Sequence, residues 1–457
     1  MPYRLCMVNQ HDAKSKVTID KNFEDLHRPF DLLQAKAEAS NCLYCYDAPC
    51  IKACPTAIDI PTFIHQIRSN NLLGSAKTIL SSNIMAGTCA RACPTEILCE
   101  QACVLNSSEQ EPVKIGELQR YAVDHLIDLE LTNNQAHPFQ RQSLTGKKIA
   151  IIGAGPAGMS CAHKASMLGH DVTIYEAKSK AGGLNEFGLA AYKMVDDFAQ
   201  REISFLLNLG GIEIKHGQTL GQNLSLDELQ EEFEAVFIGV GLADSNELIY
   251  EGEINNKVTS AIDFIEQLRQ AEDKSTVEVG SKVLVIGAGN TAIDAAIQSK
   301  RLGAQSVTLV YRRGEESMSA TNWEVDLARQ NCVNLLFWCA PKSMSEVDGK
   351  SSMVFQRTKV ENNKLVTTGE EIKLETDRVL TAIGQKLDPT SLPAMDIKAG
   401  KITVSGNYQT SMEGVFAGGD CIASGEDLTV QAVEDGKQAA YAIDRYLLKS
   451  KQAEGEI

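Results

Sequence analysis

The sequence of 457 residues contains no run of about 18 or more apolar residues, so we expect no membrane-spanning helix. Its first residues lack the long apolar run of a secretory signal, which predicts a cytoplasmic protein. Basic residues number 44 against 60 acidic ones, for a formal net charge of −16. Because nucleic acids need a basic surface, this charge argues against a nucleic-acid partner. With 43% apolar residues, the chain can form substantial cores, and its length favours about two to four domains.

Cysteine is plentiful although a secretory signal is missing. Eight of the 13 cysteines lie between residues 42 and 103. Cytosolic thiols stay reduced, so clustered cysteines there more often bind metal or carry redox chemistry than form disulfides. They form two groups of four: Cys42, Cys45, Cys50 and Cys54, and then Cys89, Cys93, Cys99 and Cys103.

The spacing of these cysteines predicts two 4Fe–4S clusters. Close spacings let one loop wrap a cluster, and a distant ligand completes it. In two-cluster ferredoxins, the cysteine before a proline binds the other cluster. Since Cys54 precedes Pro55, we expect Cys54 to join the second group and a residue of that group to complete the first cluster. Tetrahedral zinc and a reactive Cys-x-x-Cys pair remain alternatives, although only Cys42 and Cys45 have the spacing that these favour.

Hydrophobic patterns divide the chain into a helical part and an α/β part. Residues 1–140 show helical apolar spacing, whereas short buried runs alternate with helices from residue 147 onward. This alternation predicts parallel sheets with crossover helices. We therefore expect an α/β protein, with an N-terminal α-helical iron–sulfur domain and two Rossmann-like nucleotide-binding domains, the second inserted in the first. The expected bounds are 1–140 for the helical domain, 147–255 and 382–457 for the FAD-binding domain, and 256–381 for the NAD(P)H-binding domain.

The first α/β unit carries a dinucleotide-binding fingerprint. It consists of Gly153, Ala154, Gly155, Pro156, Ala157 and Gly158. Gly153 permits a tight turn, Gly155 lets the backbone approach a pyrophosphate, and Gly158 lets the helix pack on the strand. The helix N-terminus offers free N–H groups to that pyrophosphate. Glu176, at the end of the next strand, can accept hydrogen bonds from a ribose, so we expect FAD here.

The second α/β unit carries a related fingerprint with a different charge. Its residues are Gly287, Gly289, Asn290, Thr291 and Ala292, where alanine replaces the third glycine. The next strand ends in Arg312 and Arg313 instead of an acid. Guanidinium groups pair with phosphate in a bidentate fashion, so this arginine pair favours the 2′-phosphate of NADPH over NADH. A solvated pair of surface arginines is the alternative.

A third segment supports the flavin. A predicted strand ends in Gly419 and Asp420, and Thr429, Val430 and Gln431 open the next helix. An aspartate there can hold the ribityl hydroxyls, and the helix N-terminus can stabilise negative charge on the reduced flavin. Further expected cofactor contacts are Gly183, Leu184, Ile383 and Gly384.

Taken together, these features resemble the glutamate synthase small-subunit-like flavoproteins, and within them the electron-input part of dihydropyrimidine dehydrogenase. The resemblance covers roughly residues 25–450. It is strongest in CLYCYDAPCIKACPTAIDIPTFI (42–64), TCARACPTEILCEQAC (88–103) and IGELQRY (115–121). It implies an electron-input oxidoreductase that takes hydride from NADPH onto FAD and passes single electrons through two clusters. No catalytic side chain is expected, because the cofactors carry the chemistry.

The resemblance also implies individual ligands. One cluster would be held by Cys42, Cys45, Cys50 and Cys103, and the other by Cys54, Cys93, Cys99 and Gln119. Cys89 would be a spare thiol, although it stays an alternative to Gln119. Lys193 matches a basic residue of the family that contacts the flavin. Ser319 occupies the place of a further arginine that helps to hold the 2′-phosphate in the dehydrogenase branch, which leaves NADH open.

The resemblance implies that a separate partner subunit accepts the electrons. The pyrimidine site of dihydropyrimidine dehydrogenase lies on an FMN-binding barrel, for which the chain has no residues left. We therefore expect a hetero-oligomer with an FMN-containing or other electron-accepting subunit. The small subunit of glutamate synthase, with a different acceptor, is the first alternative. The second alternative is a non-enzymatic sensor that carries clusters. The two intact nucleotide sites argue against it.

Overall fold

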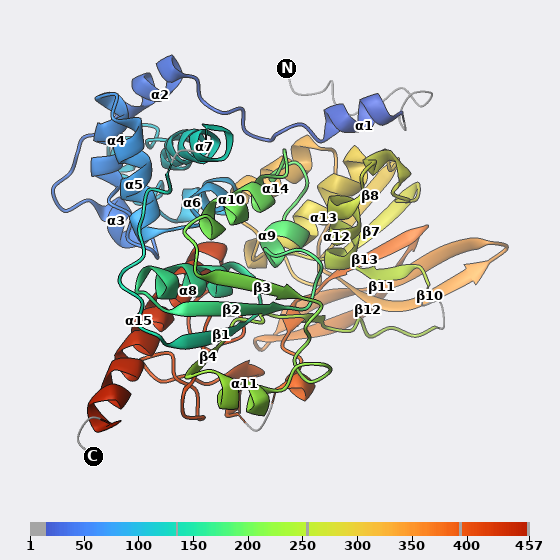
Figure 1. Cartoon of the computed structure of the whole chain (residues 1–457). Helices are drawn as coiled ribbons and strands as arrows, with labels where there is room; N and C mark the ends of the chain where they lie inside the picture. Colours follow the sequence, from blue (N-terminus) through green and yellow to red (C-terminus); the bar gives the residue numbers. More distant parts are fainter. Residues whose placement is uncertain (1–14, 134–135, 253–255, 393–394, 455–457) are drawn as a thin grey trace. The chain divides into compact units, whose positions relative to one another are not determined.

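The computed structural model describes residues 15–133, 136–252, 256–392 and 395–454 (Figure 1). Contacts divide the chain into two compact units. Unit 1 comprises the described parts of 1–26, 187–195 and 245–385, and unit 2 comprises those of 27–186, 196–244 and 386–457. The expected division into three domains stays a prediction. In the two units, as in that prediction, the segment with the second fingerprint lies along the chain between two segments of the part with the first fingerprint.

The cysteine-bearing part of unit 2 is helical, as expected. Its helices are α2 (Leu32–Ala39), α3 (Pro49–Ala53), α4 (Ile60–Arg68), α5 (Leu72–Ser82), α6 (Ala86–Ala92) and α7 (Ile115–Asn133), with short 3-10 turns η1 (Thr95–Ile97) and η2 (Val104–Ser108). Local signals start these helices. Asp59 caps α4 by accepting a hydrogen bond from the amide of Thr62 at 3.2 Å. Ile60, Phe63, Ile64 and Ile67 form the buried face of that helix.

The other part of unit 2 is built on a five-stranded parallel sheet in the order β17-β4-β1-β2-β3. Its strands are β1 (Lys148–Ile152), β2 (Asp171–Glu176), β3 (Ile212–His216), β4 (Ala235–Ile238) and β17 (Val415–Ala417). The associated helices are α8 (Pro156–Met167), α10 (Phe198–Leu207), α11 (Leu226–Glu232) and α15 (Thr429–Glu454). Small strands β15 (Ile397–Lys398) and β16 (Lys401–Ile402) pair beside them, and the 3-10 turn η5 is Pro389–Ser391. β1 is buried from Ile149 to Ile152, as a strand covered on both faces must be.

Unit 1 contains a second five-stranded parallel sheet, in the order β6-β13-β7-β8-β9. Its strands are β6 (Val258–Ser260), β7 (Lys282–Gly287), β8 (Ser306–Val310), β9 (Asn334–Leu336) and β13 (Arg378–Ala382). Its helices are α1 (Lys16–Asn22), α12 (Ala261–Gln270), α13 (Asn290–Arg301) and α14 (Asn322–Gln330), with 3-10 turns η3 (Lys274–Thr276) and η4 (Glu315–Ser317). α9 (Leu184–Phe187), β5 (Asp244–Ser245) and β14 (Gln385–Lys386) lie where the chain passes from one unit to the other.

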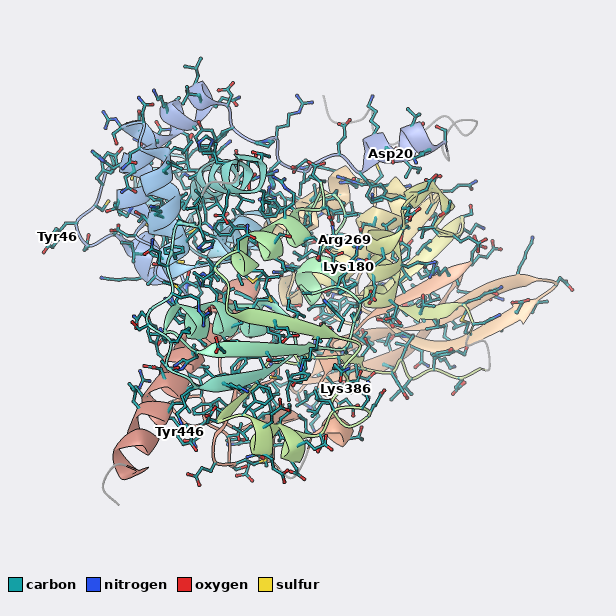
Figure 2. The ribbon with its side chains drawn as sticks, in the orientation of Figure 1. Asp20, Tyr46, Lys180, Arg269, Lys386 and Tyr446 are labelled. Atoms are coloured by element: carbon teal, nitrogen blue, oxygen red, sulfur yellow. The ribbon has the colours of Figure 1, made fainter. Side chains whose placement is uncertain are left out.

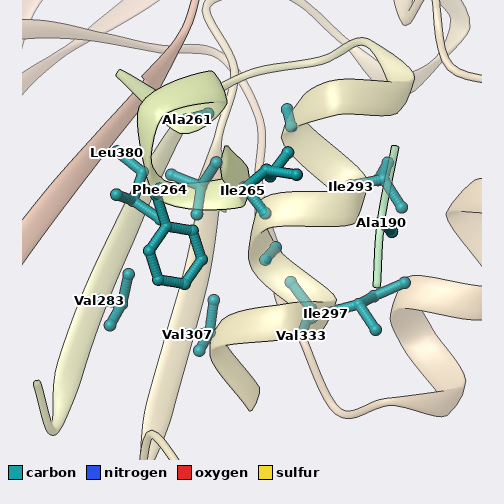
Figure 3. Close-up of a cluster of buried hydrophobic side chains, with 14 of the residues drawn as sticks. Ala190, Ala261, Phe264, Ile265, Val283, Ile293, Ile297, Val307, Val333 and Leu380 are labelled. Atoms are coloured by element: carbon teal, nitrogen blue, oxygen red, sulfur yellow. The ribbon is translucent and has the colours of Figure 1, made fainter. Parts of the chain in front are cut away.

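The core of unit 1 fills the space between this sheet and its helices (Figure 3). Phe264 and Ile265 of α12 and Ile293 of α13 pack against Val283 and Leu380 of the sheet, and each is buried. The same cluster includes Ile19 and Phe23, so the described N-terminal segment packs on the unit that holds the second fingerprint. Sequence patterns had grouped that segment with the cysteine-bearing helices.

A three-stranded antiparallel sheet completes unit 1 and has no counterpart in the sequence analysis. It comprises β10 (Cys339–Val347), β11 (Lys350–Glu361) and β12 (Lys364–Glu375), drawn in orange in Figure 1. The chain enters it directly after β9 and leaves it for β13. The insertion begins at the carboxyl end of β9, the end of the parallel sheet where ligands bind in folds of this type, and it returns the chain to the amino end of β13.

Candidate redox and nucleotide sites

Four thiols of unit 2 line one small cavity. They are those of Cys42, Cys45, Cys50 and Cys103, and apolar side chains such as Ile60 and Ile64 close the cavity. Cys103 therefore lies with the first cysteine group. Burial, together with the neighbouring thiols of Cys42 and Cys103, raises the pKa of the Cys50 thiol to about 11. Such mutual repulsion is relieved when a positively charged metal core holds thiolates, so the donor set fits an iron–sulfur cluster.

The remaining cysteines of the two groups gather separately. A hydrogen bond with Cys89 and burial raise the pKa of the Cys93 thiol, and the nearby thiols of Cys99 and Cys54 raise it further. Burial, Glu100 and then Cys54 raise the pKa of Cys99. Cys54 has thus left its sequence neighbours, because it ends helix α3 with an extended backbone that turns away from the loop before it. Cys54 thus lies with Cys93 and Cys99, and the crossed assignment of the cluster ligands stays a prediction.

The two candidates for the last ligand lie on α6 and α7, which pack against each other. Cys89 is 1% exposed on α6 and contacts the thiol of Cys93. Gln119, on α7, is 8% exposed, and its Nε2 donates to the carbonyl of Ala86 at 2.8 Å. This hydrogen bond leaves Oε1 as the group that could bind metal. Within the described ranges, no three His, Cys, Asp or Glu side chains converge as the ligands of a single metal ion.

The first fingerprint has the backbone that its glycines require. Gly153 has φ +97°, and a Cβ on Gly158 would lie 1.9 Å from the carbonyl oxygen of Gly153. Gly155 differs, since the nearest atom to its Cβ would be Cα of Gly183 at 3.9 Å. The open side of Gly155 is where a pyrophosphate can approach. Glu176 accepts hydrogen bonds from the amides of Ala154 at 2.7 Å and Lys178 at 2.8 Å, so the carboxylate is held at the loop.

The expected flavin segments meet around this loop. A Cβ on Gly419 would lie 2.9 Å from Cβ of Ala157 on α8, so Gly419 lies directly against the first fingerprint. Burial, followed by the charge of Asp427, raises the pKa of Asp420 to about 6. Thr429 starts α15, with Val430 and Gln431 in its first turn, and donates to Asn185, the neighbour of Leu184, at 3.2 Å. Sequence analysis missed Asn185 and Asp435, whose carboxylate accepts the amide of Gly419 at 3.0 Å.

The second fingerprint opens onto a cavity of about 700 Å³ in unit 1. Its lining includes several of the expected residues: Gly287, Gly289, Thr291, Arg312, Ile383 and Gly384. Ser319 also lines it, but Arg313 does not. The side chain of Asn290 accepts a hydrogen bond from the amide of Thr321 at 3.3 Å. Ala292 is buried in the core. The cavity therefore has glycine-rich backbone on one side and one guanidinium at its edge, as a phosphorylated nucleotide requires.

Lys193 lies in unit 1, in a buried network. Its ammonium is 2.9 Å from Asp294 and 2.5 Å from Glu324, and the hydroxyl of Tyr192 donates to Asp294 at 2.7 Å. Burial lowers the pKa of Lys193, but the two carboxylates more than offset that effect and raise it overall. Lys193 is thus a fixed cation. Its contact with a flavin stays a prediction.

A glycine-rich loop at the end of a parallel strand in each unit, together with half-buried cysteines gathered in two groups, defines a pyridine-nucleotide oxidoreductase with an iron–sulfur domain. Comparisons agree with this class. Residues 19–130 match the family described as dihydropyrimidine dehydrogenase domain II, 4Fe-4S cluster. Residues 147–436 match the pyridine nucleotide-disulphide oxidoreductase family.

Relatives name the group more narrowly. The chain is 34% identical over 427 residues to the NAD-dependent dihydropyrimidine dehydrogenase subunit PreT of Escherichia coli (strain K12), covering 93% of this chain and 97% of that protein. The chain is also 35% identical to the corresponding subunit PreT of Salmonella typhimurium, again covering 93% of this chain and 97% of that protein. The chain therefore belongs to the family of dihydropyrimidine dehydrogenase electron-input subunits, which are flavoprotein oxidoreductases with a 4Fe-4S domain.

Solved structures share the fold. Mycobacterium tuberculosis FprA in complex with NADPH superposes with a TM-score of 0.56 at 18% identity, covering 67% of this chain and 86% of that one. Lactococcus lactis thioredoxin reductase superposes with a TM-score of 0.53 at 22% identity, covering 66% and 99%. Every helix in the described ranges falls short of the length or apolarity that a bilayer crossing requires.

Proposed function

We propose that the chain oxidises NADPH at FAD and passes the electrons through two 4Fe–4S clusters to a partner subunit. The observation that carries this proposal is the gathering of the cysteines, most of them half-buried, into two groups that each combine both stretches of the sequence. One cluster would be held by Cys42, Cys45, Cys50 and Cys103. The other would be held by Cys54, Cys93, Cys99 and Gln119.

FAD would lie in unit 2 and the pyridine nucleotide in the cavity of unit 1. When bound, FAD supplies the step between two-electron hydride transfer and one-electron transfer to clusters. The residues of the chain bind and orient the cofactor. Gly155 and the N-terminus of α8 would receive the pyrophosphate, Glu176 the adenosine ribose, and Asp420 the ribityl hydroxyls.

The choice between NADPH and NADH rests on Arg312. Its side chain lines the cavity beside the second fingerprint, and no acid of the kind represented by Glu176 ends strand β8. A guanidinium at this place favours a 2′-phosphate. NADH is the second candidate, because the relatives are named NAD-dependent subunits. The ratio of kcat/KM for NADPH and NADH with an artificial acceptor separates the two candidates.

The partner would be an FMN-containing subunit of a dihydropyrimidine dehydrogenase. The relatives carry the word subunit in their names and match almost the whole chain. Co-purification under anaerobic conditions tests this part. A dihydropyrimidine dehydrogenase activity should require both chains, whereas oxidation of the pyridine nucleotide by an artificial acceptor should need this chain alone.

Analysis of metal and flavin content tests the proposed clusters and the proposed FAD. Anaerobic preparations should contain about eight irons and one FAD per chain if two 4Fe–4S clusters form. Zinc in their place, at about one or two ions per chain, would contradict the cluster assignment.

A further inference from the structure

The arginine pair at the end of β8 has an unusually well fixed backbone. The carbonyl of Tyr311 accepts the amide of Cys339 at 3.1 Å, and the amide of Tyr311 donates to Leu336 at 2.9 Å. The carbonyl of Arg312 accepts the hydroxyl of Thr358 at 2.7 Å. The carbonyl of Arg313 accepts the amide of Trp338 at 3.1 Å. Three consecutive carbonyls are thus bound by Trp338, by Cys339 at the start of β10 and by Thr358 of β11.

The side chains of the arginine pair, unlike its backbone, are not held by other residues that the structure describes. Arg312 and Arg313 are both exposed. Within the described residues, neither guanidinium takes part in a hydrogen bond or an ion pair, and that of Arg312 lines the nucleotide cavity. Glu315, two residues after Arg313, is paired with Arg329 at 2.6 Å. The backbone is therefore held while the guanidinium groups remain available to an anion.

Hydrogen bonds from β11 and the strained residue Trp338 hold this backbone, and we call these contacts the clamp. Thr358 is 6% exposed, and its amide donates to the carbonyl of Trp338 at 2.9 Å. Arg357 donates from Nη1 to the carbonyl of Phe337 at 3.1 Å. Trp338 has φ +59°, a left-handed conformation that a bulky residue adopts only where its surroundings impose it. Backbone of this kind concentrates at ligand-binding positions, which makes the clamp a candidate for a functional role.

We propose that Thr358 and Trp338 are positioning residues that determine nucleotide specificity, by holding the arginine pair in place for the 2′-phosphate. This inference rests on the proposed use of NADPH. A guanidinium binds phosphate best when its backbone does not have to be ordered on binding, because the ordering entropy is then already lost in the free protein. The antiparallel sheet that interrupts the parallel fold would thus serve as the support of the phosphate-recognising loop.

The hydroxyl of Thr358 can be removed with little change of shape by Thr358→Val. Thr358→Ser keeps the hydroxyl and tests for rescue. Thr376→Val is the matched control, because Thr376 is also buried and donates to the carbonyl of Arg378 at 2.8 Å, at the opposite end of strand β7 from the nucleotide cavity. The probes are adenosine 2′,5′-bisphosphate and adenosine 5′-monophosphate, whose affinities for the full-length holoprotein are measured by calorimetry.

We expect Thr358→Val to weaken the 2′,5′-bisphosphate by roughly threefold to tenfold, the effect of about one lost hydrogen bond, and to leave the 5′-monophosphate unchanged. Thr358→Ser should restore the affinity, and Thr376→Val should not alter it. An equal effect of Thr358→Val and Thr376→Val, with the wild type still preferring the 2′-phosphate, would overturn the clamp alone. Equal affinity of the wild-type protein for both probes would overturn the clamp together with the proposed use of NADPH.

Discussion

The thiol of Cys103 lies beside that of Cys42, although the two belong to different groups of the sequence. Helix α6 and the turn η1 return the chain to the loop that precedes α3. Each proposed cluster therefore draws on both stretches and joins them, as structural metal sites do. Tyr46, in the same loop, is fully exposed and points away from the ribbon (Figure 2), so the first cysteine group lies near the surface.

The crossed arrangement predicts which cluster each cysteine supports. Cys103→Ala should damage the cluster of Cys42 and Cys50, and Cys54→Ala should damage that of Cys93. EPR spectra of the two reduced variants, recorded anaerobically with iron counts, separate the clusters. If Cys103→Ala disturbs the same signal as Cys99→Ala, the crossing is absent.

The last ligand of the second cluster is tested by a pair of variants. Gln119→Ala should disturb that cluster, and Cys89→Ser should leave both clusters intact. Gln119→Cys should lower the potential of the second cluster only, because an added thiolate increases its negative charge. Redox titration followed by EPR measures the shift. Loss of a cluster in Cys89→Ser with an unaffected Gln119→Ala would instead identify Cys89 as the ligand.

Two glycines of the first fingerprint should respond differently to alanine. Gly155 has φ −75° and open space around its Cβ, so Gly155→Ala should fold normally and lose affinity for FAD. Gly158→Ala would place a Cβ against the backbone of Gly153 and should cost about 1–3 kcal/mol of unfolding free energy. Flavin content and urea unfolding of the apoprotein distinguish the two effects. Normal flavin content in Gly155→Ala would argue against a pyrophosphate at this loop.

The two arginines after β8 also form a matched pair. Arg312→Ala should weaken NADPH by about 1.5–3 kcal/mol, the value of a charge-assisted hydrogen bond, with little change for NADH. Arg313→Ala should have the smaller effect, since only Arg312 lines the cavity. Steady-state kcat/KM values for both nucleotides give the comparison. Preference for NADH in the unmutated protein would refute the role of the arginine pair.

Glu202 predicts a pH dependence of stability. Its buried carboxylate accepts the amide of Thr88 at 3.0 Å, yet burial raises the pKa of Glu202 to about 7. Since the folded pKa exceeds the ordinary value, stability from this group is complete at low pH and is lost as pH rises from about 4.5 through 7. The loss amounts to about 3 kcal/mol. Glu202→Gln should show a smaller fall in unfolding free energy between pH 5 and pH 8, measured by urea titration; an identical fall would contradict the assignment.

Much of the molecule followed from local sequence. The glycines of the two fingerprints and the strands before them depend on neighbours within a few residues, so their patterns predicted the parallel sheets correctly. The order Cys54-Pro55 also predicted that Cys54 leaves its sequence neighbours, and the electrostatic contact of Cys54 with Cys93 and Cys99 is consistent with that prediction.

Only the tertiary structure decided the contacts between distant segments. The sequence of the strands 339–375 marks no site, yet these strands support Arg312 through Thr358. Helix α14, parallel strand β9 and antiparallel strand β10 separate the two residues along the chain. Ile19 and Phe23 likewise joined the core of unit 1 because that core buries their apolar surface, which no local pattern specifies. Lys193 was placed between Asp294 and Glu324 for the same kind of reason: a buried cation needs anions, and only the folded chain shows which ones it finds.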